Sequence, residues 1–516
     1  MRPIVLIAKE ICYTFPFGYA YLAGYLKSKN ETVTVEYRPE NHHHYKAFVK
    51  KIISMNPLLV GIGTIYPDLY HAKELIKCFN DEGRTFPIVI GGQMVSPTPE
   101  FSLEITGADY GVIGEGEIIL YELVKVLRNN GDVKQVNGLV IRDNETIILT
   151  GSGDYIKDIS ALPEIPYEMF PADRWLHIGK FYTNYADYFL APMYRYSDRV
   201  IPIHGGRGCP YKCNFCFHHS VPRYRPISHM MIDAELLLQR FNANMIEFSD
   251  DLVIGTPQRA KELIIGMSSL NTRIGRKIEY SISCRFNVLS NMDDETLQGL
   301  KDSGCRIMGI GLESGSQRIL DIIHKKITIK QIITGIDRLK KVGIIPITAF
   351  MIGQYTETKE DVEESILLLK QLIKNDKNFV AQFTITTPYP GSELYDIAFK
   401  EGLIYNDMDF YNKYNPNKDL TGVSVNMSNM DDDVVLMYRN KMERIYLNEK
   451  KKVIDPHVLI IETVRGQLSR FVFLMKTIIS KCFNNYNTVC MINTYIDKFH
   501  DIIQLWLDKK RIVGMY

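Results

Sequence analysis

The sequence predicts an α/β protein with two successive sheet domains and a helical C-terminal region. Short apolar runs alternate with amphipathic stretches over residues 1–140 and again over residues 200–425. Alternation of this kind is typical of parallel strands joined by helices. The chain of 516 residues is also too long for one ordinary hydrophobic core. We therefore expect domains at 1–140 and 200–425, a connector at 141–199 and a helical region at 426–516.

Composition narrows the class of protein. A hydrophobic content of 46% and a charged content of 23% are those of a soluble globular chain. The net charge of +1 gives no reason to expect nucleic acid as a partner. The opening MRPIVLIAKE is too short an apolar run for a signal peptide, and no run of about 18 apolar residues predicts a transmembrane segment. The odd number of cysteines argues against a secreted disulfide scaffold, so we expect a cytoplasmic protein.

In the first domain we expect a doubly wound parallel sheet. Strands are predicted at Ile4–Ala8, Thr32–Tyr37, Leu59–Ile65, Pro87–Gly91 and Tyr110–Ile113, with helices at Tyr19–Ser28, Tyr45–Met55, Leu69–Asp81 and Ile118–Asn129. Ligands of such sheets bind at the carboxyl ends of the strands. Glycines there allow a ligand to approach the backbone, although they also serve ordinary turns. The candidates are Gly91, Gly92, Gly114, Glu115 and Gly116.

The connector begins with a predicted β-hairpin over residues 137–150, in which DNE is the turn between GLVIR and TIILT. The following stretch, LPEIPYEMFPADRW, is rich in proline and aromatic residues. Prolines favour an extended segment crossing between domains. The tyrosines that follow predict packing between domains rather than a binding site.

Three cysteines stand close together after the connector. Cys209, Cys213 and Cys216 form a CxxxCxxC pattern in GGRGCPYKCNFCFHH, so three of nine cysteines fall within eight residues. Thiolates are the usual ligands of 4Fe–4S clusters, and three of them would leave one iron without a protein ligand. A structural zinc site is the alternative. It would need a fourth ligand, for which His218 or His219 is available.

The second domain has about six repeated strand and helix signals. Its strands are predicted at Val200–His204, Met245–Ser249, Glu279–Cys284, Arg306–Gly311, Ile345–Ile352 and Val380–Thr386. Such repeats form either an open sheet or a barrel, with reactive groups at the carboxyl ends of the strands. Cys284 and Cys305 fall on these strands and are expected to be buried apolar residues.

The cysteine pattern, with a strand before it and an aromatic residue before the last cysteine, resembles the radical S-adenosylmethionine (SAM) superfamily. The resemblance implies a partial (β/α)6 barrel, similar to a TIM barrel. It also implies a 4Fe–4S cluster held by Cys209, Cys213 and Cys216, whose open iron binds SAM and reduces it. SAM would then be cleaved to a 5′-deoxyadenosyl radical.

The resemblance also implies a set of SAM contacts at successive strand ends. Ser249, Asp250 and Asp251 would lie near the methionyl amino group, and the Arg285 guanidinium could pair with the carboxylate. Glu313 and Ser314 would meet the ribose. Gly353 and Glu357 belong to a run that resembles the GxIxGxxE-like adenine motif, although its usual proline is missing, and Phe215 would lie against adenine. The stretch TTPYPGSELY, which resembles PxPGTxLY, would border the substrate.

The first domain resembles the cobalamin-binding domain that precedes many radical SAM modules. The matching stretches are FPFGYAYLAGYLK, VGIGTIY, IVIGGQMVSPTPE and ADYGVIGEGE. The DxHxxG pattern, whose histidine ligates cobalt in other cobalamin domains, is missing. The run His42 to His44 lacks its flanking residues, so we expect no histidine of this domain below cobalt.

The C-terminal region predicts helices at Met437–Lys451, Val458–Cys482 and Asp497–Lys509. Charged residues interrupt the apolar runs, which favours packed or amphipathic helices. A contact with a membrane surface is the alternative for this region.

Taken together, the resemblance implies a cobalamin-dependent radical SAM enzyme. Its expected activity is methylation of an unactivated carbon in a natural product or lipid. It would need a small-molecule or lipid substrate and an electron donor, namely a reductase with flavodoxin or ferredoxin. A radical cyclase or rearrangement enzyme is the first alternative, and a cluster- or cobalamin-binding sensor is the second. Methylthiolation of tRNA would require a second cluster and an RNA-binding module, and the sequence indicates neither.

Overall fold

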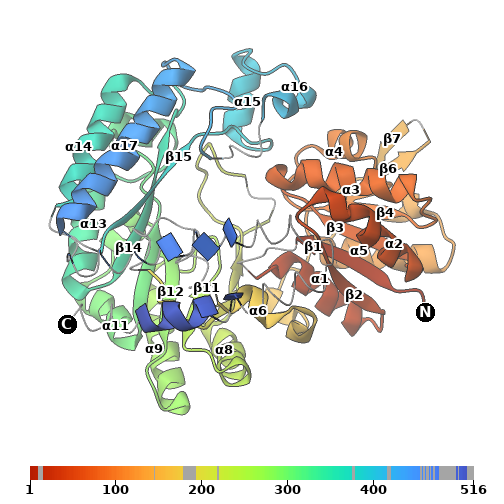
Figure 1. Cartoon of the computed structure of the whole chain (residues 1–516), viewed down its shortest axis with the longest axis horizontal. Coiled ribbons are helices and arrows are strands. Elements are labelled where there is room, and N and C mark those ends of the chain that lie inside the picture. Colours follow the sequence, from red (N-terminus) through yellow and green to blue (C-terminus); the bar gives the residue numbers. More distant parts are fainter. Residues whose placement is uncertain are drawn as a thin grey trace.

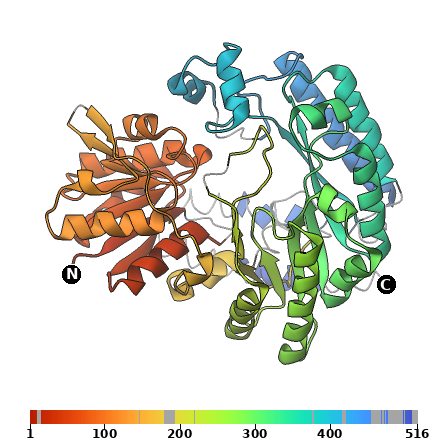
Figure 2. The ribbon, with the colours of Figure 1, turned by 180° about the vertical axis from the view of Figure 1, so that it is seen from behind.

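The computed structural model describes residues 1–9, 15–144, 146–177, 193–217, 220–374, 378–414 and 420–453, with scattered positions between 456 and 507. Two α/β units face each other, with the chain between β8 (Val200–Ile203) and α8 (Ile227–Phe241) lying between them (Figure 1). The view from behind shows the same arrangement, with the yellow-green loop between the two sheets (Figure 2). The α/β fold class predicted from the sequence is confirmed.

The N-terminal sheet contains seven strands in the order β2-β1-β3-β4-β5-β6-β7. Its strands are β1 (Ile4–Lys9), β2 (Val33–Arg38), β3 (Leu59–Gly63), β4 (Ile88–Gly91), β5 (Tyr110–Val112), β6 (Leu139–Asp143) and β7 (Thr146–Leu149). The first five are parallel. Helices cover both faces because alternate residues of β1 are apolar on each side. Val5 and Ile7 pack in one core, and Ile4 and Leu6 pack in the other.

The helices of this domain are α1 (Phe17–Ser28), α2 (Tyr45–Ser54), α3 (Leu69–Asp81), α4 (Pro99–Thr106) and α5 (Gly116–Arg128). Helices α1 and α5 contribute to one apolar core, and α2 and α3 contribute to the other. Helix α4 is not predicted from the sequence. Its eight residues are too few for a clear helical period, although Pro99 at its first turn and Gly107 after its end are helix signals.

The predicted hairpin joins the N-terminal sheet. Strand β6 pairs with β5 in the antiparallel sense, and β7 pairs with β6. The sheet therefore continues past residue 140, where the sequence analysis placed the end of the domain. Three short 3-10 turns lie in or near this domain, η1 (His42–His44), η2 (Tyr66–Asp68) and η3 (Val133–Gln135), and η4 (Ile159–Ala161), η5 (Tyr167–Met169) and α6 (Ala172–Trp175) follow in the connector.

The central sheet contains six parallel strands in chain order, β8-β11-β12-β13-β14-β15. The further strands are β11 (Met245–Phe248), β12 (Glu279–Cys284), β13 (Cys305–Ile310), β14 (Ile345–Ile352) and β15 (Val380–Ile385). In the described part of the chain no pairing joins β8 to β15. The sheet is thus an open, partial barrel.

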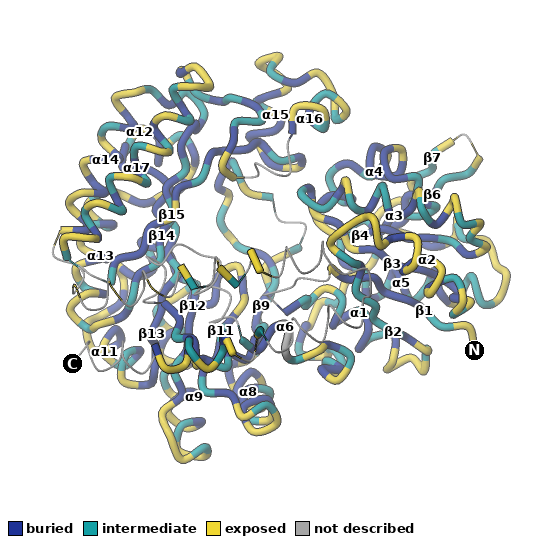
Figure 3. The backbone as a smooth tube through the Cα atoms, in the orientation of Figure 1, coloured by how far each residue is buried: buried dark blue, intermediate teal, exposed yellow. Residues whose placement is uncertain are grey.

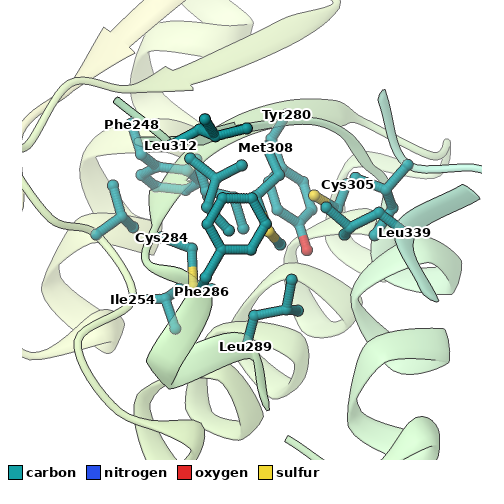
Figure 4. Close-up of a cluster of buried hydrophobic side chains, with 14 of the residues drawn as sticks. Phe248, Ile254, Tyr280, Cys284, Phe286, Leu289, Cys305, Met308, Leu312 and Leu339 are labelled. Carbon is teal, nitrogen blue, oxygen red and sulfur yellow. The ribbon is translucent and has the colours of Figure 1, made fainter. Parts of the chain in front are cut away.

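Helices cover the outer face of the central sheet (Figures 1 and 3). They are α8, α9 (Pro257–Ile274), α10 (Phe286–Ser290), α11 (Asp294–Ser303), α12 (Gln317–Ile322), α13 (Ile329–Val342) and α14 (Lys359–Ile373). Figure 4 shows strand residues such as Phe248, Tyr280 and Met308 gathered against Phe286 and Leu289 of α10. Cys284 and Cys305 are buried in the same core, as the sequence predicted.

After β15 the chain forms α15 (Glu393–Lys400), α16 (Asp407–Lys413) and the long helix α17 (Asp432–Val453). Helix α17 packs on α14 and β15 and contains the predicted helix 437–451. Residues 499–507 are helical, within the predicted helix 497–509, whereas most of the predicted helix 458–482 lies outside the described residues. No described helix combines the length and the apolar character needed to cross a membrane.

Candidate functional site

A cavity of about 830 Å³ lies between the two α/β domains. From the N-terminal domain it is lined by residues that follow β1, β3, β4 and β5, and from the second domain by residues that follow β8 and β11. The carboxyl ends of both sheets therefore face one space, which is where ligands of such sheets bind.

The five predicted residues of the N-terminal domain all line this cavity. They are Gly91, Gly92, Gly114, Glu115 and Gly116. Gly92 has a φ of 108°, and a Cβ there would lie 2.4 Å from the carbonyl oxygen of Thr64. Gly114 has a φ of 86° with nothing within 4 Å of such a Cβ, so its backbone is open. A side chain at Gly92 is excluded by both the backbone conformation and the lack of space, so backbone atoms form the cavity wall there.

Glu115 lines the cavity and also contacts the second domain. Arg207 Nη1 donates to its Oε2 atom at 2.8 Å, and the guanidinium of Arg223 also donates to it. The other nitrogen of Arg207 donates to Glu117 Oε1 at 2.5 Å. All four side chains are at most 10% exposed. We call this set of two arginines and two glutamates the interdomain ion cluster.

Opposite charges within the ion cluster shift the pKa values of Glu115 and Arg207. Burial alone would raise the pKa of Glu115, but Arg223 and Arg207 beside it hold that pKa below its usual value. Burial would likewise lower the pKa of Arg207, and Glu117 raises it. Glu115 and Arg207 are therefore charged. The cluster joins β9 (Gly206–Arg207) and β10 (Arg223–Tyr224) to the start of α5. Glu115, predicted as a cofactor contact, holds the domains together in the structure.

His204 and Tyr21 also line the cavity, and the sequence analysis assigned them no role. The hydroxyl of Tyr21 lies 3.2 Å from His204 Nδ1, and the Arg207 guanidinium lies over the Tyr21 ring at 4.9 Å. Burial, together with Arg207, lowers the pKa of His204 to about 4. The imidazole is therefore neutral at neutral pH. The run His42 to His44 forms η1 and lines no part of the cavity.

The three cysteines of the pattern lie on the loop that follows β8. All three are free thiols. Cys213 is buried, Cys209 is partly buried and Cys216 is exposed. The antiparallel pair β9 and β10 joins the beginning of this loop to its end. Gly208 has a φ of 71°, and a Cβ there would lie 2.4 Å from the carbonyl oxygen of Ser220. The two ends of the loop are therefore held together by β9 and β10, and the three cysteines lie in the chain between these two strands.

The cysteines do not converge as ligands of a single ion do. Across the residues that the structure describes, no three His, Cys, Asp or Glu side chains are arranged to hold one metal ion. His218 and His219, the predicted alternative zinc ligands, lie outside the described residues. A 4Fe–4S cluster is an extended body bound by separate thiolates at its corners, so three free thiols on one loop fit it better than a single zinc ion.

Asp250 fixes the beginning of the cysteine loop. Its Oδ1 atom accepts a hydrogen bond of 2.6 Å from the backbone N–H of Gly205. Its Oδ2 atom is buried without a partner. Burial raises the pKa of Asp250 to about 7, and the backbone donors oppose that rise. Ser249 and Asp251, on either side, line the interdomain cavity. All three predicted residues thus lie where the cavity meets the second sheet.

Arg285 lies against the cysteine loop. Its Nη1 atom donates to the sulfur of Cys213 at 3.6 Å, and its Nη2 atom donates to the carbonyl oxygen of Lys325. The guanidinium also lies 3.8 Å from the centre of the Tyr211 ring. The sequence analysis expected this side chain to pair with the carboxylate of SAM. In the structure it contacts a cysteine sulfur, which sequence spacing could not indicate, and its contact with SAM stays a prediction.

Glu313 adopts a left-handed backbone conformation with a φ of 70° after β13. Its carboxylate pairs with Lys325 Nζ at 2.7 Å, and both side chains are less than 10% exposed. Lys325 Nζ in turn lies 5.9 Å from the centre of the Phe215 ring. The hydroxyl of Ser314 lies 3.3 Å from that of Ser365. The structure thus places Glu313 and Phe215 close to one lysine, next to the cysteine loop.

Glu357 closes the turn after β14. Its Oε2 atom accepts hydrogen bonds from the backbone N–H groups of Gly353 at 2.6 Å and Gln354 at 3.3 Å. Burial raises the pKa of Glu357 to about 8, although the two backbone donors lower it. The Gln354 side chain is fully buried and neither of its amide atoms has a partner. Burial of an unpaired amide is costly, so Gln354 is a candidate ligand contact that the sequence analysis missed.

The predicted substrate-bordering loop packs on the cysteine loop. The backbone N–H of Leu394 donates to the carbonyl oxygen of Asn214 at 2.8 Å. A Cβ at Gly391, whose φ is 88°, would lie 2.7 Å from Phe217 and from Pro97 of the N-terminal domain. Residues after β15, the cysteine loop and the N-terminal domain therefore meet at one place.

Comparison with known proteins gives the family of each domain. Residues 203–369 match the model of the radical SAM superfamily, and residues 5–124 match that of the B12 binding domain. The chain belongs to the radical SAM superfamily and carries a B12-binding domain. Together the two matches span more than half of the chain. They contain the residues that line the cavity and the three cysteines of the loop.

Named relatives match 70–79% of this chain. An uncharacterised methyltransferase of Pyrococcus horikoshii is 28% identical over 75% of this chain and 79% of its own length. The anaerobic magnesium-protoporphyrin IX monomethyl ester cyclase of Cereibacter sphaeroides is 24% identical over 79% of this chain and 63% of its own. The hopanoid C-2 methylase of Rhodopseudomonas palustris is 21% identical over 70% of this chain and 60% of its own.

Solved structures show the same fold. The radical SAM methyltransferase TsrM of Kitasatospora setae, with cobalamin and a 4Fe–4S cluster bound, has a TM-score of 0.62 and 17% identity over 78% of each chain. The cobalamin-dependent radical SAM enzyme OxsB has a TM-score of 0.59 and 17% identity over 98% of this chain and 72% of its own. Both likenesses concern the fold.

Proposed function

We propose that this protein is a cobalamin-dependent radical SAM enzyme that methylates an unactivated carbon of a small molecule or lipid. The observation that carries the proposal is the cavity between the carboxyl ends of two sheets, with a loop of three free thiols beside it. Several relatives are methyltransferases by name, acting on bacteriochlorophyllide d or hopanoids. The domain division 1–140, 141–199, 200–425 and 426–516 is part of the proposal, with the hairpin β6–β7 counted with the first sheet.

The residues present fit the cofactors on physical grounds. Cys209, Cys213 and Cys216 would hold the 4Fe–4S cluster, because they are free thiols on one loop anchored at its neck. The glycine-lined cavity would hold cobalamin, because its walls lack side chains where Gly92 and Gly114 turn. When bound, the cluster supplies reductive cleavage of SAM to a 5′-deoxyadenosyl radical, and cobalamin supplies the methyl group.

The SAM contacts proposed for this chain lie around the cysteine loop. Asp250 has an unpartnered buried oxygen that could accept a hydrogen bond from the amino group of SAM. Ser249 and Asp251 lie beside it, facing the cavity. Glu313, Ser314, Gly353, Glu357 and Phe215 complete the proposed set. Arg285 is proposed to bind SAM only after it leaves its contact with Cys213.

The protein's own groups orient the partners and exclude water. The interdomain ion cluster joins the two halves of the cavity, and Tyr21 and Phe17 cover part of the wall next to His204. Asp250 holds Gly205 at the start of the cysteine loop. We propose that these contacts keep the reacting groups at a fixed separation, which is the main contribution of a protein scaffold to cofactor chemistry.

A radical cyclase is the second candidate. Two relatives are anaerobic magnesium-protoporphyrin IX monomethyl ester cyclases, each 24% identical to this chain. The products separate the candidates. Methylation predicts S-adenosylhomocysteine together with 5′-deoxyadenosine, whereas cyclisation predicts 5′-deoxyadenosine alone. A sensor would cleave no SAM.

The test is anaerobic purification with cobalamin supplied, followed by counts of iron, sulfide and cobalt and an ultraviolet–visible spectrum. The protein is then incubated with SAM and dithionite, and both nucleoside products are measured. The proposal expects one four-iron cluster and one cobalt per chain, and it expects 5′-deoxyadenosine. A protein that binds iron but never cobalt would contradict the cobalamin assignment. In the cell, we propose that flavodoxin or ferredoxin with a reductase in the cytoplasm replaces dithionite.

A further inference from the structure

Arg285 is a buried cation that lacks a carboxylate partner. The described part of the chain buries two other arginines, and both have such a partner. Arg38 pairs with Asp68 at 3.0 Å, and Arg306 pairs with Glu279 at 2.7 Å. Arg285 is 6% exposed, and no carboxylate of the described residues forms an ion pair with it. Because arginine stays protonated in proteins, its charge must be compensated by some other group.

Three contacts fix the direction of the Arg285 guanidinium. The side-chain oxygen of Asn287 accepts a hydrogen bond of 3.4 Å from Nε, and the carbonyl oxygen of Lys325 accepts one from Nη2. The guanidinium lies 3.8 Å from the centre of the Tyr211 ring, and the Tyr211 hydroxyl accepts a hydrogen bond of 3.0 Å from Asn287. With Nε and Nη2 held in this way, Nη1 is the nitrogen that meets the cysteine loop.

The atom that Nη1 meets is the sulfur of Cys213, at 3.6 Å. Cys213 is the most buried of the three cysteines of this loop. The next residue, Asn214, anchors the loop to the end of α12. Its backbone N–H donates to the carbonyl oxygen of Ile323, and its side-chain amide donates to that of Ile322, both at 3.2 Å. The sulfur is therefore fixed by the backbone on one side and the guanidinium by three contacts on the other.

The contact with sulfur supplies the compensation that Arg285 lacks elsewhere. A cysteine that ligates iron does so as a thiolate, so its sulfur carries negative charge. Hydrogen bonds to the ligand sulfurs and the net charge around a cluster are among the factors that set its reduction potential. A positive charge and an N–H donor at one ligand sulfur favour the form with the extra electron. They therefore raise that potential.

We propose that Arg285 raises the reduction potential of the 4Fe–4S cluster through its hydrogen bond to the sulfur of Cys213. The inference rests on the proposed function, because it assumes that the three cysteines hold a cluster. The reduction concerned takes one electron from an added reductant, and no covalent bond forms or breaks. This role belongs to the protein without SAM, since the contact with Cys213 would end when Arg285 moves to the carboxylate of SAM.

The test measures the reduction potential of the cluster in the full-length protein, purified anaerobically and freed of SAM. The protein is titrated with dithionite or titanium(III) citrate, and the reduced cluster is detected by electron paramagnetic resonance. Arg285→Met removes the charge and every donor, whereas Arg285→Gln keeps a neutral N–H donor. The control is Arg338→Met, which removes a guanidinium from α13, where it pairs with Asp294 at 2.8 Å. Iron and sulfide counts and circular dichroism accompany each protein.

We expect reduction of the cluster in Arg285→Met to be at least tenfold less favourable than in the wild-type protein. For a one-electron couple that factor is a fall of about 59 mV in potential. Arg285→Gln should lie between the two, because it keeps a donor without the charge. Arg338→Met should have the wild-type potential, because the charge it loses lies on an outer helix.

Equal potentials in the wild-type protein and in an Arg285 variant that holds four irons would overturn the inference. A role in SAM binding alone predicts that result, together with weaker binding of SAM. Where only Arg285→Met loses its iron, the potential of Arg285→Gln decides. Loss of the cluster from both variants would also overturn the inference, because Arg285 would then be needed for assembly of the site. Failure of the proposed function is visible separately, as a wild-type protein that assembles no four-iron cluster or cleaves no SAM.

Discussion

Removal of the Arg207 charge should weaken the docking of the two α/β domains. In the wild-type protein the guanidinium contacts Glu115 and Glu117 of the N-terminal domain and lies over the Tyr21 ring. Arg207→Met keeps an unbranched apolar chain for packing but removes the charge. Glu115 retains Arg223, whereas Glu117 loses its only described cationic partner. The variant therefore leaves one carboxylate buried and unpaired between the domains.

The expected cost follows from that unpaired carboxylate. Breaking a buried ion pair by removing one partner typically costs about 3–5 kcal/mol. Loss of the guanidinium over the Tyr21 ring adds about 0.5–2 kcal/mol. At 1.4 kcal/mol per factor of ten, the first effect alone makes opening of this interface about a hundredfold or more easier. The double variant Arg207→Met with Glu117→Gln removes both charges, so it should recover about half of the loss or more.

Native-state hydrogen exchange measures this opening directly. We expect the amides of residues 115–120 and 205–208 to exchange faster in Arg207→Met, while amides in the core of α3 stay as in the wild-type protein. The double variant should be intermediate. Surface charge is controlled with Arg273→Met, whose guanidinium pairs with Glu235 outside the interface. Equal exchange rates in the single and double variants, with a coupling below about 0.5 kcal/mol, would refute the reasoning.

Three further variants test separate parts of the site. The pKa of Glu357 is about 8 in the folded protein against 4.5 when unfolded, so its contribution to stability is present below pH 4.5 and is lost as pH rises to 8. Glu357→Gln should reduce this decline of the unfolding free energy with pH, measured by urea unfolding. An unchanged dependence on pH would contradict the prediction. Gly92→Ala should lower the cobalt content, and the stability by about 1 kcal/mol or more, because its Cβ would meet the Thr64 carbonyl. Gly83 also has a positive φ, of 72°, but free space around it, so Gly83→Ala should keep its cobalt. Cys213→Ala should lose the cluster iron and all SAM cleavage but retain cobalt, and retained cleavage would show that Cys213 is not a ligand.

The order of elements could be predicted from local patterns. Strands β12 and β14 and helix α3 begin and end where the sequence placed them. Each has a clear period of apolar residues, and that period depends only on neighbouring positions. The cysteine spacing and the paired glycines were equally local, which is why the loop after β8 and the cavity wall at Gly91 and Gly92 could be anticipated.

Partners across the fold could not be predicted in this way. Glu115 and Arg285 stay predicted cofactor contacts, but their protein partners were not predicted, and the hairpin was placed in the connector. In the structure Glu115 pairs with two arginines, Arg285 contacts Cys213, and the hairpin extends the first sheet. In each case the deciding neighbour lies tens of residues away along the chain, so no local period records it.

The sequence by itself determined which segments become strands and helices, because burial alternates with a period set by the backbone. It also determined that three thiols share one loop. Only the tertiary structure decided which charges are neutralised. Glu279 meets two arginines and Glu247 meets none, although both are inward glutamates on adjacent strands of one sheet. The difference arises because the pairing of a buried charge depends on groups brought in from other strands and loops.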